Sequence, residues 1–251
     1  MELTTKHRLA LEQAECYRHE GYLLYKAPVF APEKFAHLQA IFEENLERYG
    51  EDDLDIMHVR DARLLEFLLS DEVLDLVGPV IGPGSGLWSS HFISEPAGVG
   101  RATPWHEDSS YWNGSISTLE GICTVWLALD EATRENGCMK VIPGSHTQGA
   151  AGFSEYEEVS KKQNIFHIQI KPEQVDESRA VDFELQPNHC SLHEAHIIHG
   201  TDANTSSKRR AGYTMRYFPA TSKVFVQPTK DGGRFWLARG KDRAGNRFKN
   251  A

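Results

Sequence analysis

The stretch "TPWHEDSSYW", residues 103–112, places His106 and Asp108 two positions apart, with a tryptophan on each side. Imidazole nitrogens and carboxylate oxygens are common metal ligands. Alternate side chains of a β-strand share a face, so an extended segment following Pro104 would point both groups at one ion. Such a pair often arises by chance, and a metal site here needs a third ligand from elsewhere in the chain.

A histidine-rich stretch, "NHCSLHEAHIIHG" at 188–200, offers that ligand through His189, His193, His196 or His199. The HExxH pattern of zinc proteases is excluded, because His193 and His196 are one residue too close. Zinc-finger spacing is excluded because no cysteine pair accompanies these histidines. On one strand over 189–199, His193 and His199 share a face and His196 points away. Both remain candidates, and the position of His199 at the end of an apolar run, before Gly200, favours it.

Two arginines, Arg209 and Arg210, follow His199 by ten and eleven residues. A guanidinium binds a carboxylate through two parallel hydrogen bonds. Two histidines and one carboxylate form the facial triad of non-haem iron(II) oxygenases and leave three positions of the ion open. A 2-oxo acid fills two of them and O2 the third, while the far carboxylate of 2-oxoglutarate needs a cation. The combined pattern therefore predicts Fe(II), with 2-oxoglutarate as cosubstrate and O2 as oxidant.

Three stretches in this order resemble the phytanoyl-CoA dioxygenase family of Fe(II)/2-oxoglutarate-dependent oxygenases. They are "WHEDSSYW", "TVWLALDEATRENGCMKVIPGSH" at 124–146, and "HGTDANTSSKRR" at 199–210. The resemblance runs from about Leu87 to Tyr217, over half of the chain. It implies a double-stranded β-helix core flanked by helices.

Site residues follow from the resemblance position by position. His106, Asp108 and His199 resemble the iron ligands. Arg210 resembles the arginine that binds the far carboxylate of 2-oxoglutarate. Three further residues resemble other contacts of this cosubstrate: Thr201, Trp126 and His91. His91, in "SSHFISEP", departs in type from the family pattern.

The expected activity is oxidation, foremost hydroxylation, of an unactivated C–H bond in a small metabolite or natural product, with release of succinate and CO2. The aspartate at 108 supports this, because a glycine or alanine there would open a position for chloride and suggest a halogenase. Two alternatives remain open. One is a cupin-like metal-dependent isomerase or ring-cleaving dioxygenase that does not use 2-oxoglutarate, and the other is an inactive binding protein on the same scaffold.

Other polar and aromatic residues near these motifs have simpler interpretations. "ENGC" at 135–138 and "PGSH" at 143–146 are typical of turns. We expect His193 and His196 to be ordinary polar residues or partners of the ligands, and His146 to be structural. Trp105, Tyr111 and Trp112 either line a substrate pocket or pack against the sheet.

The elements that must position these residues change in character along the chain. Residues 1–80 are helix-rich, with helices expected over 5–19, from Pro32 to Gly50, and after Ser70 as a cap. "GPVIGPGSG" from Gly78 marks a boundary. Short strands are expected at 87–95, 121–129, 138–142, 181–185, 189–199 and 211–218. This pattern predicts a mainly β fold with flanking helices, a double-stranded β-helix (jelly-roll, cupin-like) core.

We expect a single oxygenase domain over 1–251, with the core at 87–218 and a C-terminal segment at 219–251. The polar stretches 147–178 and 234–249 are candidates for an insert or lid, and Arg239 or Lys241 for closing over the site, although a solvated basic tail is the simpler expectation.

The 251 residues carry a net charge of −9, which disfavours broad binding of nucleic acid or anionic membranes. Four widely spaced cysteines and the lack of a signal-peptide pattern indicate a cytoplasmic protein with reduced thiols. The expected partner is a small-molecule substrate, and the oligomeric state is not predicted.

Overall fold

The fold is that of a computed structural model, which describes residues 9–98, 100–147, 154–225 and 235–249. Its α-helices are α1 (Leu11–Glu20), α2 (Pro32–Tyr49), α3 (Met57–Arg60), α4 (Leu65–Leu68), α5 (Asp71–Ile81) and α6 (Ser109–Trp112). Its strands are β1 (Tyr22–Tyr25), β2 (Ser85–Glu95), β3 (Thr103–His106), β4 (Cys123–Ala128), β5 (Met139–Val141), β6 (Tyr156–Glu158), β7 (Ile168–Ile170), β8 (Val181–Asp182), β9 (Cys190–Glu194), β10 (His199–Thr201), β11 (Arg210–Pro219) and β12 (Trp236–Arg239).

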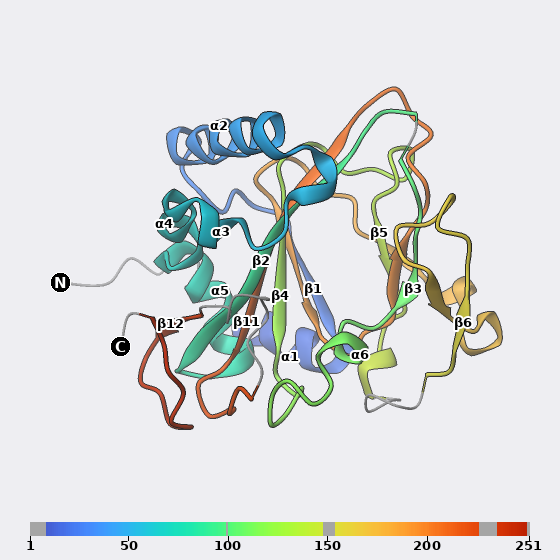
Figure 1. The fold of residues 1–251 in the computed structure, drawn as a ribbon. Helices are drawn as coiled ribbons and strands as arrows, with labels where there is room; N and C mark the ends of the chain where they lie inside the picture. Colours follow the sequence, from blue (N-terminus) through green and yellow to red (C-terminus); the bar gives the residue numbers. More distant parts are fainter. Residues whose placement is uncertain (1–8, 99, 148–153, 226–234, 250–251) are drawn as a thin grey trace.

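Two antiparallel sheets form the core. The larger has the strand order β1-β9-β4-β11-β2-β12, and the smaller has the order β3-β10-β5-β8. In Figure 1 the larger sheet occupies the centre of the molecule, and β3 and β5 of the smaller sheet lie to its right. The helical segments α2 to α5 cover the side of the larger sheet that faces away from the smaller one. The predicted mainly β, jelly-roll architecture with flanking helices is confirmed.

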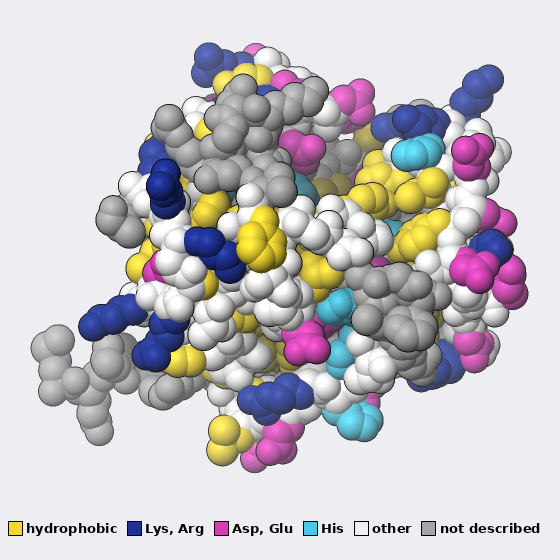
Figure 2. Space-filling model, turned by 60° about the horizontal axis from the view of Figure 1, so that its bottom comes forward, with side chains coloured by type: hydrophobic (Ala, Val, Ile, Leu, Met, Phe, Trp, Pro, Cys, Tyr) yellow, Lys and Arg dark blue, Asp and Glu magenta, His cyan; other side chains and the backbone are white. Residues whose placement is uncertain are grey.

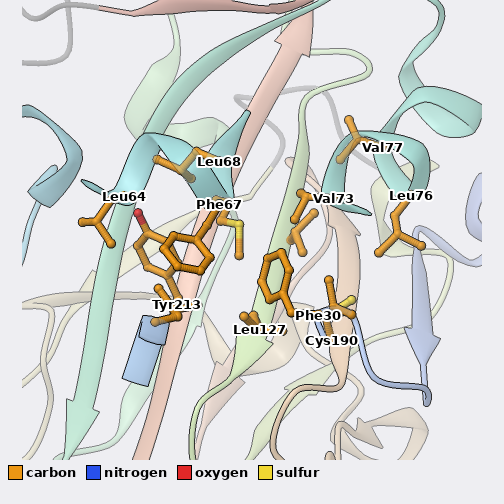
Figure 3. Packing of buried hydrophobic residues seen from close by; sticks show 14 of the residues in the cluster. Phe30, Leu64, Phe67, Leu68, Val73, Leu76, Val77, Leu127, Cys190 and Tyr213 are labelled. Atoms are coloured by element: carbon orange, nitrogen blue, oxygen red, sulfur yellow. The ribbon is translucent and has the colours of Figure 1, made fainter. Parts of the chain in front are cut away.

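Strand β11 shows why the large sheet has one apolar and one polar face. Its odd-numbered residues Tyr213, Met215 and Tyr217 are fully buried in the main hydrophobic cluster. They meet the helices there, and Figure 3 shows Tyr213 close to Leu64 and Phe67. Burial of each such side chain contributes about 1.5–3 kcal/mol. The even-numbered residues of β11 face the other way, toward the space between the sheets.

The helices differ from expectation at their ends. The first helix was predicted over 5–19 but begins at Leu11, and residues 5–8 lie outside the described residues. Ser70 occupies the N-cap position of α5, but its hydroxyl donates to the Phe67 carbonyl instead of accepting from the helix. The change from helix to strand falls within the predicted "GPVIGPGSG" stretch, although α5 continues through Gly78 to Ile81 with Pro79 inside it. Proline has no N–H, so α5 lacks one backbone hydrogen bond at this residue.

The strands differ in two respects that matter for the site. The run 189–199 was predicted as one strand, but β9 ends at Glu194 in the large sheet and β10 begins at His199 in the small sheet. The core is also wider than 87–218, because β1 pairs with β9 and β12 pairs with β2 at the two edges of the large sheet. Hydrophobic periodicity alone does not show that a continuous apolar run passes from one sheet to the other.

Within the described residues no helix is both long enough and apolar enough to cross a membrane.

Candidate metal centre and adjoining cavity

His106, Asp108 and His199 meet between the two sheets. Each offers one ligand atom, and the three atoms lie within 4.8 Å of one another. The imidazole rings of His106 and His199 are 4.1 Å apart between centroids, and His106 Nε2 lies 3.9 Å from Asp108 Oδ1. All three residues are buried. Two imidazoles and a carboxylate at these separations can hold one divalent ion on one side and leave its other side open.

Both histidines are oriented by the backbone. His106 Nδ1 lies 2.8 Å from the Pro104 carbonyl, and His199 Nδ1 lies 2.9 Å from the Ile197 carbonyl. A carbonyl oxygen only accepts, so each Nδ1 carries the proton and donates it. The Nε2 lone pair of each ring is therefore free for a metal, which is the arrangement that metal-binding histidines adopt in proteins.

The fold brings these ligands together across a strand pair and a short helix. His106, the last residue of β3, pairs directly with His199, the first residue of β10. Asp108 is not on the strand that was predicted for it, since its backbone is helical and it precedes α6. The Ser109 amide donates to the Ala195 carbonyl at 2.9 Å, which fixes this turn against the loop leading to His199. The carboxylate thus reaches the histidines because the chain turns, not because alternate residues share a strand face.

A cavity of about 900 Å³ adjoins the three residues. Its inner wall is the polar face of the large sheet, on which Arg210, Gly212, Thr214 and Arg216 of β11 follow one another. Glu95, Ile93, His91 and Ser89 of β2 are their respective strand partners. Figure 2 shows hydrophobic side chains bordering a hollow on one face of the molecule.

One end of this wall is suited to a carboxylate. Arg210 is buried, and its Nε donates to the Asn136 carbonyl at 3.3 Å. Glu95 is its strand partner. Burial raises the pKa of Glu95, and the charge of Arg210 partly opposes this rise. Burial lowers the pKa of Arg210, and the charge of Glu95 partly opposes this fall. Thr201 lines the same cavity, and its hydroxyl accepts from the Thr103 amide at 3.1 Å.

The "ENGC" turn, predicted to be structural, supports this end of the cavity. The Asn136 side chain accepts from the Thr133 amide at 2.8 Å and donates to the Glu131 carbonyl at 2.7 Å. Gly137 has a φ of +75°, and a Cβ there would lie 2.5 Å from the Asp202 carbonyl oxygen. The turn therefore holds in place the Asn136 carbonyl that accepts the hydrogen bond from Arg210. Only glycine fits at the following residue, Gly137.

Trp126 of β4 forms the middle of the wall. It is buried, lines the cavity, and pairs with Thr214 of β11. Its indole lies over Gly212, where a Cβ would be 2.3 Å from Trp126 Cζ2. The glycine therefore makes room for the ring.

The other end of the wall lies at the candidate metal site. Arg216 Nε donates to Asp108 Oδ2 at 3.2 Å, and its guanidinium also contacts the His91 ring. Sequence reasoning missed Arg216, although its even spacing of six residues from Arg210 was an available signal. His91, predicted as a cosubstrate contact, lines the cavity but lies beside Arg216 rather than beside Arg210.

The remaining histidines separate into two environments. His193 lines the cavity, with its ring centroid 5.0 Å from that of His199, and it lies outside the group of three ligands. His196 instead binds Glu194 through its amide and its Nδ1. His146 contacts the Arg18 carbonyl at 3.1 Å, in line with the structural role expected for it.

Several aromatic residues line the cavity. Tyr111 and Trp112 of α6 line it, together with Trp88 and Phe166. Trp105 does not, because its indole nitrogen donates to Glu177 and its ring lies under the Lys140 ammonium. The stretch 147–178 contains β6 and β7 and contributes Phe166 to the cavity wall, and residues 148–153 lie outside the described residues.

The C-terminal segment does not reach this cavity within the described residues. Arg239, considered for closing over the site, is bound to Asp71 and Asp75 of α5 at 2.6 and 2.7 Å. Lys241 lines a separate small cavity beside Pro219. Residue 234 lies outside the described residues.

The electrostatics of the centre favour metal-binding protonation states. Burial, reinforced by the neighbouring His199, lowers the pKa of His106 to about 3. Burial by itself raises the pKa of Asp108, but Arg216 and the surrounding imidazoles together hold it well below its ordinary value. Burial also lowers the pKa of His199. Near neutral pH the group therefore consists of two neutral imidazoles and one carboxylate, the forms that bind a metal.

Comparison with known proteins gives one family. The family model of phytanoyl-CoA dioxygenase (PhyH) matches residues 17–212. A "Phytanoyl-CoA dioxygenase domain-containing protein 1 homolog" of Dictyostelium discoideum is 25% identical over 171 residues, which are 68% of this chain and 60% of that protein.

Among solved structures, "non-heme monooxygenase; ThoJ apo" superposes with a TM-score of 0.74 at 22% identity, over 92% of this chain and 84% of that one. EctD from S. alaskensis, with 2-oxoglutarate and 5-hydroxyectoine, superposes with a TM-score of 0.72 at 18% identity, over 96% and 87%. At these identities the two structures support the fold.

Proposed function

The chain belongs to the phytanoyl-CoA dioxygenase family, and from this premise we propose that it is an Fe(II)- and 2-oxoglutarate-dependent oxygenase that hydroxylates a small molecule. The observation that carries the proposal is that the buried His106, Asp108 and His199 line the same cavity as Arg210.

The donor set fits iron(II). Two imidazoles that present Nε2, together with one carboxylate, are the facial triad that such iron enzymes use. A bound iron(II) supplies the oxidative chemistry: O2 is reduced while 2-oxoglutarate is converted to succinate and CO2, and the substrate gains a hydroxyl group. The protein contributes binding, orientation and the exclusion of water.

Arg210 receives the far carboxylate of 2-oxoglutarate in this proposal. Its guanidinium is buried, and the Asn136 carbonyl orients it from one side. Thr201 adds a hydroxyl at the same end, and the Trp126 ring limits the width of the cavity between Arg210 and the metal ligands. A charge-assisted hydrogen bond of this kind contributes about 1.5–3 kcal/mol.

The substrate then occupies the outer, aromatic part of the cavity. A volume of about 900 Å³, shared with the cosubstrate, fits a small metabolite or a natural product. Trp88, Trp112 and Phe166 offer flat apolar surfaces near the metal ligands. Hydroxylation of an unactivated C–H bond is the reaction that we assign to this arrangement.

The first experiment adds Fe(II) and 2-oxoglutarate to the protein without oxygen and records the weak visible charge-transfer band of the complex. We expect a band in the wild type, none in Asp108→Ala, and an unchanged band in the control Asp130→Ala, whose carboxylate binds Arg209 outside the cavity. A wild type without a band, or a band that survives in Asp108→Ala, contradicts the assignment of the metal site.

The second experiment screens a metabolite library for substrate-dependent release of succinate and identifies the products by mass spectrometry. Product gaining one oxygen atom, with one succinate formed for each, is the expected result. Turnover of a compound without succinate release would favour a metal-dependent isomerase or a ring-cleaving dioxygenase instead.

A further inference from the structure

Arg216 is a buried cation for which the proposed reaction provides no role. It lies on β11, six residues beyond Arg210 and on the same face, so about 20 Å of strand separates the two positions. Its residue exposure is only 9%. A guanidinium is expensive to bury unless it is paired, and here its ion-pair partner is a candidate metal ligand.

The two oxygens of the Asp108 carboxylate face different groups. Oδ1 lies toward the histidines, 3.9 Å from His106 Nε2. Oδ2 accepts a hydrogen bond from Arg216 Nε at 3.2 Å. The arginine therefore binds a different carboxylate oxygen from the one that lies nearest to His106 Nε2.

Arg216 is itself held in place by two side chains and by an irregularity in its strand pairing. Its guanidinium carbon lies 5.2 Å from the centroid of the Trp112 ring, and its Nη1 contacts the His91 imidazole. The strand pairing breaks at the same point: Arg216 pairs with Ser89 but Tyr217 pairs with Leu87, so Trp88 is an extra residue on β2. Bulges of this kind redirect side chains next to functional sites. An arginine fixed in this way can impose an orientation on the carboxylate that it binds.

We propose that Arg216 is a positioning residue that keeps Asp108 Oδ2 occupied, so that Asp108 binds the metal through Oδ1 alone. The inference rests on the proposed function, since it concerns the metal of that site. A carboxylate can bind a metal through one oxygen or both. Binding through both would fill one of the three positions that the cosubstrate and O2 require.

A purely electrostatic role for Arg216 makes a different prediction. If the arginine only balances the charge of Asp108, its removal changes how tightly the metal binds but leaves the number of open positions at three. Removal of the hydrogen bond under our proposal frees Oδ2 to turn toward the metal and reduces that number to two. Counting the water molecules on a bound metal therefore separates the two roles, and it does not depend on catalysis.

The experiment uses Mn²⁺ as the probe, without 2-oxoglutarate, in the full chain. Electron paramagnetic resonance of free Mn²⁺ gives the bound fraction, and water-proton relaxation gives the relaxivity of each bound ion, which is proportional to its number of exchangeable waters. We expect Arg216→Met, which has no hydrogen-bond donor, to lower this relaxivity to about two-thirds of the wild-type value, since two of three positions remain. The control Arg209→Met removes an arginine bound to Asp130 and Glu43 and keeps the wild-type relaxivity.

The outcomes separate the inference from the function beneath it. Wild-type protein that binds no Mn²⁺ contradicts the proposed metal site and the inference with it. Wild-type relaxivity in a folded Arg216→Met, checked by circular dichroism, overturns the role of Arg216 alone. If Arg216→Met does not fold, Arg216→Leu decides, because it also lacks a hydrogen-bond donor. A relaxivity below the wild type supports the inference, and an equal value overturns it.

Discussion

The close contact between Gly212 and Trp126 in the cavity wall predicts that a substitution at residue 212 changes both protein stability and cosubstrate binding. A Cβ at residue 212 would lie 2.3 Å from Trp126 Cζ2 and 2.5 Å from Cε2, far inside contact distance. Gly212→Ala must therefore displace the indole. Overpacking of this kind lowers the free energy of unfolding by about 1–3 kcal/mol. For a chain of this size the corresponding fall in Tm is about 2–12 °C. Because the ring lines the cavity, we also expect a higher KM for 2-oxoglutarate.

A double-mutant cycle with Trp126→Leu shows whether the ring causes this loss. Once the indole is gone, Gly212→Ala is expected to be neutral or to stabilise the protein by about 0.4–1 kcal/mol, because alanine restricts the unfolded chain. Gly78→Ala in α5 is the control, since a Cβ there meets only an arginine nitrogen at 4.0 Å. Thermal unfolding of the four proteins of the cycle gives the coupling. An equal loss of stability with and without the indole would refute the contact as its origin.

Three further predictions concern other parts of the molecule. Arg210→Lys replaces a fork by a single ammonium and is expected to raise the KM for 2-oxoglutarate by about 10–150-fold, from a loss of about 1.5–3 kcal/mol. The Mn²⁺ affinity of this variant without cosubstrate should equal that of the wild type. If the variant lost Mn²⁺ affinity as well as 2-oxoglutarate binding, Arg210 would not act on the cosubstrate alone. Gly137→Ala is expected to destabilise the protein and to raise the same KM, because its Cβ would lie 2.5 Å from the Asp202 carbonyl; an unchanged KM would show that the turn does not hold Arg210. Burial, with a smaller effect of Lys249, lowers the pKa of His58 to about 4. Below pH 6.5 the unfolded state then binds more protons than the folded state, so stability present at pH 7 is lost as the pH falls from 6.5 toward 4. The loss is up to about 2 kcal/mol at pH 5. Urea unfolding at pH 7 and pH 5 should show this loss of unfolding free energy in the wild type and a smaller loss in His58→Gln. An equal loss in the two proteins would contradict the role of His58.

The sequence carried the candidate ligands because their types and spacing are local properties. The pair His106 and Asp108, the later His199 and the following Arg210 could be selected from chemistry and family resemblance without coordinates. Their convergence could not be derived correctly. Asp108 was placed on a strand and lies at the start of a helix, and His193 and His199 were placed on one strand and lie in different sheets. The three predicted residues do converge, although the geometric argument that placed them on strands was wrong.

Residues whose role depends on another element were not accessible from the sequence. The spacing of Arg216 from Arg210 could have shown that they share a strand face, but only the fold brings Asp108 to Arg216. The role of Asn136 depends on its backbone carbonyl, which any residue possesses, and on a turn that delivers it to Arg210. Trp105 was a plausible cavity residue by position, but it points to Glu177 instead. In each case the deciding contact joins residues that are distant in sequence.

Strand β11 connects the stability of this fold to its chemistry. Its odd residues Tyr213 and Tyr217 anchor the helix-covered core, and its even residues Arg210 and Arg216 carry charge into the cavity. A shift of one residue in its pairing would exchange the two sets, burying both guanidiniums among apolar side chains. Each buried arginine has a carboxylate beside it from another element: Glu95 of β2 pairs with Arg210 in the sheet, and Asp108 binds Arg216. These carboxylates compensate the charges only in the observed register. The same strand alignment that aims two cations at the cavity is therefore the one in which the protein is stable, so changes that slip β11 should abolish folding and ligand binding together.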